Sequence, residues 1–174
     1  MRIVGLCFIF RNAGYIAISY SVISSAKKLR RGDHIAWPTQ QMKGVLAHHA
    51  IVLASKGDSV VKVIHVTGTQ DGNEYEVVEQ LIDVGDHIKN GKLWRYDYEP
   101  GKCYDPDKVI TRAKEKVGKY AYDVLRNNCE HFARWCKTDK NVSVQATVTV
   151  GLAAAGVATA ASSAGSALSK FGNR

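Results

Sequence analysis

The order of apolar and polar positions along the chain predicts strands first and helices later. Between residues 30 and 99, short apolar runs rich in β-branched and aromatic residues alternate with turn residues. The turn residues Lys56-Gly57-Asp58 separate two such runs and predict a β-hairpin. The predicted strands are 30–37, 45–55, 59–68, 74–84 and 92–99.

Two helices are predicted after the strands. Asp105-Pro106 is a favourable helix start, and apolar residues with helical spacing follow it up to Gly118, which we expect to end the helix. A second helix is predicted from Asn128 to Lys137. The order of elements predicts an α+β fold, in which a small antiparallel sheet packs on helices.

The two ends of the chain differ in amino-acid composition from residues 30–140. Residues 1–29 are apolar and aromatic, with Arg11 as a charge inside the run, and a basic cluster begins at Lys27. A signal sequence, a membrane anchor and a buried element all remain open for this segment. Residues 141–174 are rich in Ala, Gly and Ser, and this tail is a candidate membrane helix, with an amphiphilic helix or a disordered tail as the alternatives.

The amino-acid composition limits the classes of binding partner that the protein is expected to have. The formal net charge of +8 on 174 residues suits an anionic partner. The chain lacks the sequence motifs of nucleic-acid-binding modules, which favours an anionic membrane surface over nucleic acid, with a merely basic soluble protein as the alternative. Its four cysteines form no CxxC pair, so we expect neither a structural zinc site nor a disulfide framework. We therefore expect a cytoplasmic protein associated with intracellular membranes.

Cys129 is a candidate nucleophile because it opens the second predicted helix. Backbone N–H groups and the helix dipole at such a position lower a thiol pKa and can hold an oxyanion. Asn128 is a suitable N-cap residue. His131 lies two residues further on, points away from Cys129 on a helix, and is expected to cap or pack.

A thiol nucleophile needs a base, and the predicted hairpin offers histidines for this role. His48 and His49 lie on its first strand and His65 on its second. Because side chains alternate along a strand, only one of His48 and His49 can face Cys129. A metal site formed by His48, His49 and Cys129 is a weaker alternative, since no carboxylate pattern supports it.

Four motifs resemble the lecithin retinol acyltransferase-like proteins over residues 30–138. They are "GDHI" at 32–35, "HHAIVL" at 48–53, "VIHV" at 63–66 and "NNCEHFARWC" at 127–136. The resemblance implies a permuted papain-like fold, shared with bacterial cell-wall cysteine peptidases. It makes Cys129 the nucleophile, His48 the base, with His49 as its rival, and His65 the residue that orients the base. Asn128 and His49 are supporting residues.

The resemblance also implies an activity. Such proteins act as phospholipases A1/A2 and as N- or O-acyltransferases through an acyl-thioester, here on Cys129. The expected partners are a glycerophospholipid donor, a water, amine or lysophospholipid acceptor, and a membrane surface. No metal or organic cofactor is expected. A cysteine peptidase or amidase and a non-catalytic membrane-anchored interaction module are the alternatives.

Deleting residues 141–174 is expected to reduce binding to anionic vesicles more than activity on detergent-dispersed lipid, because the tail would hold the protein on the bilayer. Cosedimentation and a lipid hydrolysis assay measure the two effects. Unchanged vesicle binding would refute the anchor hypothesis.

Overall fold

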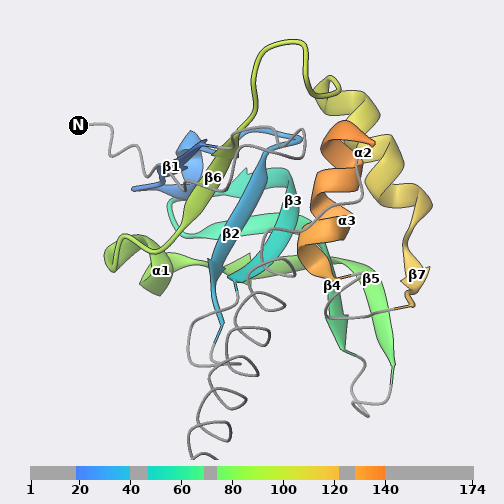
Figure 1. Ribbon diagram of the computed structural model, residues 1–174. Coiled ribbons are helices and arrows are strands. Elements are labelled where there is room, and N and C mark those ends of the chain that lie inside the picture. Colours follow the sequence, from blue (N-terminus) through green and yellow to red (C-terminus); the bar gives the residue numbers. More distant parts are fainter. Residues whose placement is uncertain (1–18, 40–46, 69–73, 122–127, 140–174) are drawn as a thin grey trace, which may run out of the picture.

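The computed structural model describes residues 19–39, 47–68, 74–121 and 128–139, and these form an antiparallel sheet with helices packed on it (Figure 1). In sheet order the strands are β1-β6-β2-β3-β4-β5-β7. Their bounds are β1 Ser19–Val22, β2 His34–Pro38, β3 Ala47–Lys56, β4 Val60–Gly68, β5 Tyr75–Asp83, β6 Trp94–Asp97 and β7 Gly118–Lys119. The helical elements are the 3-10 turn η1 Ala26–Lys28 and the helices α1 Gly85–Lys89, α2 Pro106–Glu115 and α3 Cys129–Thr138. The predicted α+β fold is confirmed.

The predicted hairpin is β3 and β4, joined through the turn at Gly57, whose φ of 77° favours glycine. The register places His65 opposite Ala50. His48 lies two residues before Ala50 on the same strand face, which makes His48 and His65 diagonal neighbours. Hairpin register therefore brings these two side chains within reach of each other.

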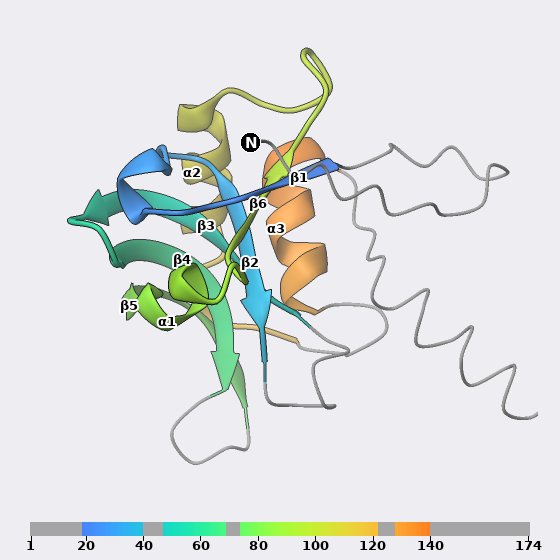
Figure 2. The same cartoon turned by 90° about the vertical axis from the view of Figure 1, so that its left-hand side faces the viewer.

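Helices α2 and α3 lie side by side against one face of the sheet (Figures 1 and 2). Their apolar residues, among them Ile110 and Phe132, pack on Ile51 and Ile64 of the hairpin. Because residues two apart share a strand face, this cluster selects the odd-numbered positions of β3 and the even-numbered positions of β4. We call this side of the sheet the α3 face.

The opposite face of the sheet carries a second core, which we call the α1 face. Ala50, Val52 and Val63 of the hairpin pack there with Ile35 and Leu93. Ile23, Ala26 and Leu29 are buried in the same cluster. Residues 19–29, which we assigned from the sequence to the apolar N-terminal segment, thus contribute β1, η1 and core side chains to the fold.

Helix starts follow the sequence signals, whereas one helix end does not. The Asp105 side chain accepts from the N–H of Lys108 at the start of α2, with Pro106 in the first turn. Helix α2 ends at Glu115, and Gly118 belongs to β7 with a φ of 117°. The prediction that Gly118 ends the helix is therefore wrong by one turn, because this glycine serves the strand that follows.

The two predicted membrane segments fall largely outside the described residues, namely at 1–18 and 140–174. Within the described ranges, no helix combines the length and apolar character needed to cross a bilayer.

Candidate active site

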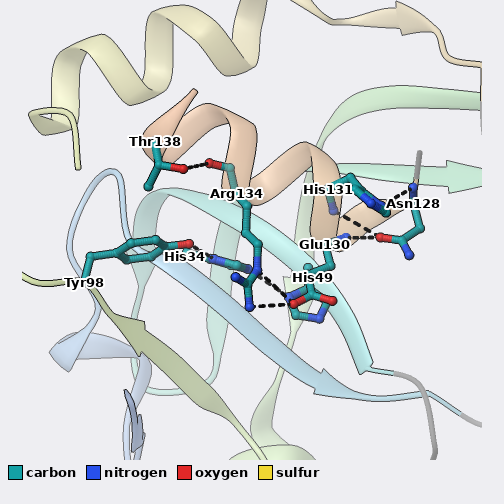
Figure 3. A network of polar contacts seen from close by, with 8 residues as sticks. All are labelled: His34, His49, Tyr98, Asn128, Glu130, His131, Arg134 and Thr138. Atoms are coloured by element: carbon teal, nitrogen blue, oxygen red, sulfur yellow. Dashed lines mark hydrogen bonds and ion pairs between the residues drawn. The ribbon is translucent and has the colours of Figure 1, made fainter. Parts of the chain in front are cut away.

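The N-terminus of α3 is closed by side-chain caps. Asn128 Oδ1 accepts from the backbone N–H groups of Glu130 and His131 at 3.0 and 3.1 Å. His131 Nδ1 in turn accepts from the Asn128 N–H at 3.2 Å, which completes a capping box with histidine in the usual Glu or Gln position (Figure 3). The prediction that His131 caps or packs at the helix start is confirmed by this contact.

The thiol of Cys129 lies against the backbone at the start of β3. Its S–H donates to the carbonyl oxygen of Ala47 at 3.8 Å, and the backbone N–H of His49 donates a hydrogen bond to the sulfur. These two backbone groups flank His48 in the chain. The described pairing of β3 with β4 begins further on, at Ala50 and His65, so the sulfur meets β3 where that ladder has not started.

Burial dominates the acidity of this thiol. The residue is 7% exposed, and burial raises the pKa of Cys129 to about 11 although backbone N–H groups of His49, Glu130 and Cys129 itself lower it in part. The sequence predicted a net lowering at the helix start. That prediction is wrong in sign, since loss of hydration outweighs the helix terminus, and the folded protein carries a protonated thiol at neutral pH.

His48 and His65 form a hydrogen-bonded pair on the α1 face. Nε2 of His48 lies 2.7 Å from Nδ1 of His65, and Nε2 of His65 lies 2.8 Å from Oε1 of Gln80 on β5. The ring of Trp37 lies 5.0 Å from that of His48. Burial, followed by the neighbouring His65 and His49, lowers the pKa of His48 to about 3, so its imidazole is neutral at pH 7.

His49 lies on the α3 face and joins a different network (Figure 3). Its Nδ1 is 2.8 Å from Nε2 of His34, whose Nδ1 is 2.7 Å from the Tyr98 hydroxyl. Burial lowers the pKa of His49 to about 4, while the Glu130 carboxylate opposes this shift. Glu130 itself accepts from Arg134 at 2.8 and 2.9 Å, and both side chains are buried.

The predicted site residues thus lie around residues 47–49, although strand alternation places His49 on the face where α3 packs and His48 on the other face, next to the backbone that the thiol contacts. His48 and His65 bond each other, and Cys129 contacts the backbone on both sides of His48. Among the residues that the structure describes, the hydrogen-bond partner of the thiol is a backbone oxygen and not an imidazole nitrogen. No cluster of three or more His, Cys, Asp and Glu side chains within the described ranges is arranged to hold a metal ion.

Sequence reasoning missed His34, Gln80 and the Glu130–Arg134 pair. The i,i+4 spacing of Glu130 and Arg134 on a predicted helix was an available signal. For Gln80 no sequence signal was available, because its contact with His65 depends on the β4–β5 register. That register places Gln80 opposite Val63 and two residues from Val78, the partner of His65.

Comparison with known proteins identifies the family. The family model described as lecithin retinol acyltransferase matches residues 27–142, which is more than half of the chain. The chain belongs to this family. Phospholipase A and acyltransferase 1 from Mus musculus is 44% identical over 77 residues, covering 40% of this chain and 46% of that relative. The match thus spans less than half the length of this curated relative, and no solved structure matches the chain.

Acid is expected to destabilise the protein, because three buried histidines and the half-buried His48 stay neutral in the fold. Burial lowers the pKa values of His34, His48, His49 and His65 below their ordinary value of 6.5. The unfolded chain therefore binds more protons below pH 6.5, and the free energy of unfolding falls as pH falls, by about 1.4 kcal/mol per pH unit for each histidine that remains neutral.

Urea unfolding at pH 7.5, 6.5 and 5.5 measures this slope. The variant His34→Gln should show a shallower slope by one histidine, whatever its stability at pH 7.5. A free energy of unfolding that is the same at all three pH values would contradict the burial of neutral imidazoles.

Proposed function

We propose that this protein is a thiol-dependent acyl hydrolase and acyltransferase that uses a glycerophospholipid as acyl donor. The observation that carries the proposal is the position of the Cys129 thiol, which contacts the two backbone groups on either side of His48. The His48 ring is in turn hydrogen-bonded to His65. Membership of the lecithin retinol acyltransferase family supports acyl transfer as the reaction class. The printed name of the mouse relative supports a phospholipid donor.

In the first half-reaction, Cys129 attacks the ester carbonyl while His48 takes its proton. The sulfur–carbon bond forms as the S–H bond breaks, and the carbonyl oxygen gains the negative charge. A thiol with a pKa of about 11 and an imidazole with a pKa of about 3 do not exchange a proton at rest, so we place the transfer within the attack itself. We assign the backbone N–H groups of His49 and Cys129, which donate hydrogen bonds to the sulfur, as the donors to the oxyanion.

Collapse of the tetrahedral intermediate breaks the ester C–O bond. His48 returns the proton to the departing oxygen, and a lysophospholipid leaves while the acyl group stays on Cys129 as a thioester. In the second half-reaction His48 takes a proton from water, an amine or a lysophospholipid hydroxyl as this acceptor attacks the thioester. The C–S bond then breaks, and the Cys129 sulfur regains its proton from His48. Water releases a fatty acid, which is the phospholipase A1/A2 outcome, and the other acceptors give N- or O-acylation.

A membrane surface is the natural site of such a reaction. The net charge of +8 favours an anionic bilayer, and phospholipid substrates reside there. We therefore propose that the protein works in the cytoplasm on intracellular membranes.

One observation favours a different function. A buried thiol with its pKa raised to about 11 is what a cysteine without a chemical role would show, and the protein would then be a membrane-anchored interaction module. A cysteine peptidase or amidase of the permuted papain-like group would use the same residues on another substrate. Both alternatives are outcomes of the experiment that follows.

Incubation of the full chain with phosphatidylcholine vesicles is expected to add the mass of one fatty acyl group. The adduct should be absent in Cys129→Ala and retained in Cys103→Ala, because Cys103 is a half-buried cysteine outside the site and serves as the matched control. Intact-protein mass spectrometry measures this. If the unmodified protein forms no adduct and releases no fatty acid, the proposal fails; an adduct with peptide or amide substrates alone would favour the peptidase alternative.

Substitution of the histidines separates the base from its neighbours. His48→Ala is expected to lower fatty acid release about 10²- to 10⁴-fold, as loss of a general base does. His65→Ala should cost less than this, and His49→Ala should cost least once the folded fraction is taken into account by circular dichroism. A loss from His49→Ala alone that equals the loss from His48→Ala would identify His49 as the base.

A further inference from the structure

Three side chains from three adjacent strands form a hydrogen-bonded row on the α1 face. Gln80 of β5 contacts His65 of β4 at 2.8 Å, and His65 contacts His48 of β3 at 2.7 Å. In the described part of the chain, His48 and Gln80 are the side chains to which His65 is hydrogen-bonded. Gln80 therefore lies at the β5 end of the row and His48 at the β3 end, where the Cys129 thiol contacts the backbone of Ala47 and His49. Gln80 has no role in the reaction as described so far.

The direction of the hydrogen bonds follows from the glutamine. An amide oxygen only accepts, so Nε2 of His65 must carry the hydrogen in the bond to Oε1 of Gln80. A neutral imidazole has one N–H, so Nδ1 of His65 is an acceptor, and Nε2 of His48 donates to it. This leaves the lone pair of His48 on Nδ1, which within the described residues has no hydrogen-bond partner.

We propose that Gln80 is a positioning residue for the reaction, which selects the tautomers of His65 and His48 so that Nδ1 of His48 is the nitrogen that receives the Cys129 proton. The inference rests on the proposed function for its kinetic consequences, whereas the tautomers themselves are a property of the folded protein. In the opposite tautomer Nδ1 of His48 would carry a hydrogen and could not accept another.

The chemistry of an amide suits this position better than that of a carboxylate. A carboxylate bonded to His65 would favour the imidazolium form and keep a proton on the histidine pair, whereas a neutral amide orients the ring without that charge. The one carboxylate next to Gln80 in sequence, Glu79, pairs with Lys62 and Lys114 on the α3 face. On the α1 face the titratable residues near this row include Glu76, which lies two residues before Val78, the β5 partner of His65, and His87 of α1, whose ring lies 6.2 Å from that of Trp37.

Gln80 can be substituted without disturbing the packing of the core. The described pairing of β5 with β7 covers only Glu76 and Val77, so Gln80 lies on a part of β5 that is exposed on its outer side. The neighbouring Leu81 is 58% exposed and supplies a matched control on the same strand. Substitutions at either position leave both core clusters intact.

The test compares Gln80→Leu, Gln80→Glu and the control Leu81→Ala in the full chain. Gln80→Leu removes the acceptor, and we expect kcat to fall about tenfold with KM unchanged. Gln80→Glu keeps an acceptor and should restore kcat at high pH. Its carboxylate raises the pKa of the histidine pair, so the neutral base form is lost at a higher pH. The acidic limb of the kcat–pH profile therefore shifts to higher pH. Leu81→Ala should match the unmodified protein.

Nitrogen-15 NMR of the imidazoles reads the tautomers without any need for activity. We expect Nε2–H on both His48 and His65 in the unmodified protein and in Leu81→Ala, and mixed tautomers in Gln80→Leu. Nδ1–H on His65 in the unmodified protein, or tautomers unchanged in Gln80→Leu, would overturn the proposal. Failure of the proposed function looks different, because the protein would then show the expected tautomers and form no thioester.

Discussion

Alternation of side chains along β3 is the constraint on which the arrangement of the site depends. His48 and His49 are consecutive, so they must point to opposite faces of the sheet. His48 bonds His65 on one face, and His49 bonds His34 beside α3 on the other. The Cys129 thiol contacts the backbone on either side of His48, at the carbonyl of Ala47 and the N–H of His49. One short stretch of strand therefore carries the proposed base, contacts the helix of the proposed nucleophile and contacts its sulfur.

The network on the α3 face explains how the helix is held in place. Glu130 follows Cys129 in the chain and His49 follows His48, and the carboxylate and this imidazole interact electrostatically. Arg134 neutralises Glu130 in a buried ion pair, and His34 and Tyr98 extend the contacts across β2. A buried pair of this kind contributes little net stability because desolvation offsets attraction. The pair instead links the helix to the sheet, because Glu130 interacts with Arg134 on α3 and with His49 on β3.

Local patterns predicted the elements, and tertiary contacts decided the rest. Turn residues around Gly57 and the cap at Asp105 were sufficient for the β3–β4 hairpin and the start of α2, because their causes lie within a few residues. Gln80 could not be identified in this way, since its contact depends on the register of β4 and β5. The acidity of Cys129 was predicted with the wrong sign because burial depends on how α3 packs. The sequence left open whether residues 19–29 are a membrane segment or part of the fold, because hydrophobicity alone does not distinguish a protein core from lipid.

The protonated state of the Cys129 thiol has a consequence for life in a cell that contains oxidants and electrophiles. With a pKa of about 11, about one molecule in ten thousand carries a thiolate at pH 7. Since the thiolate is the form that peroxides and alkylating agents attack, such a cysteine is chemically quiet toward small reagents in solution. In the proposed reaction the thiol reacts only when a substrate carbonyl group and a proton acceptor are both present at the sulfur. The burial that keeps the Cys129 thiol protonated would therefore also protect the proposed nucleophile between turnovers.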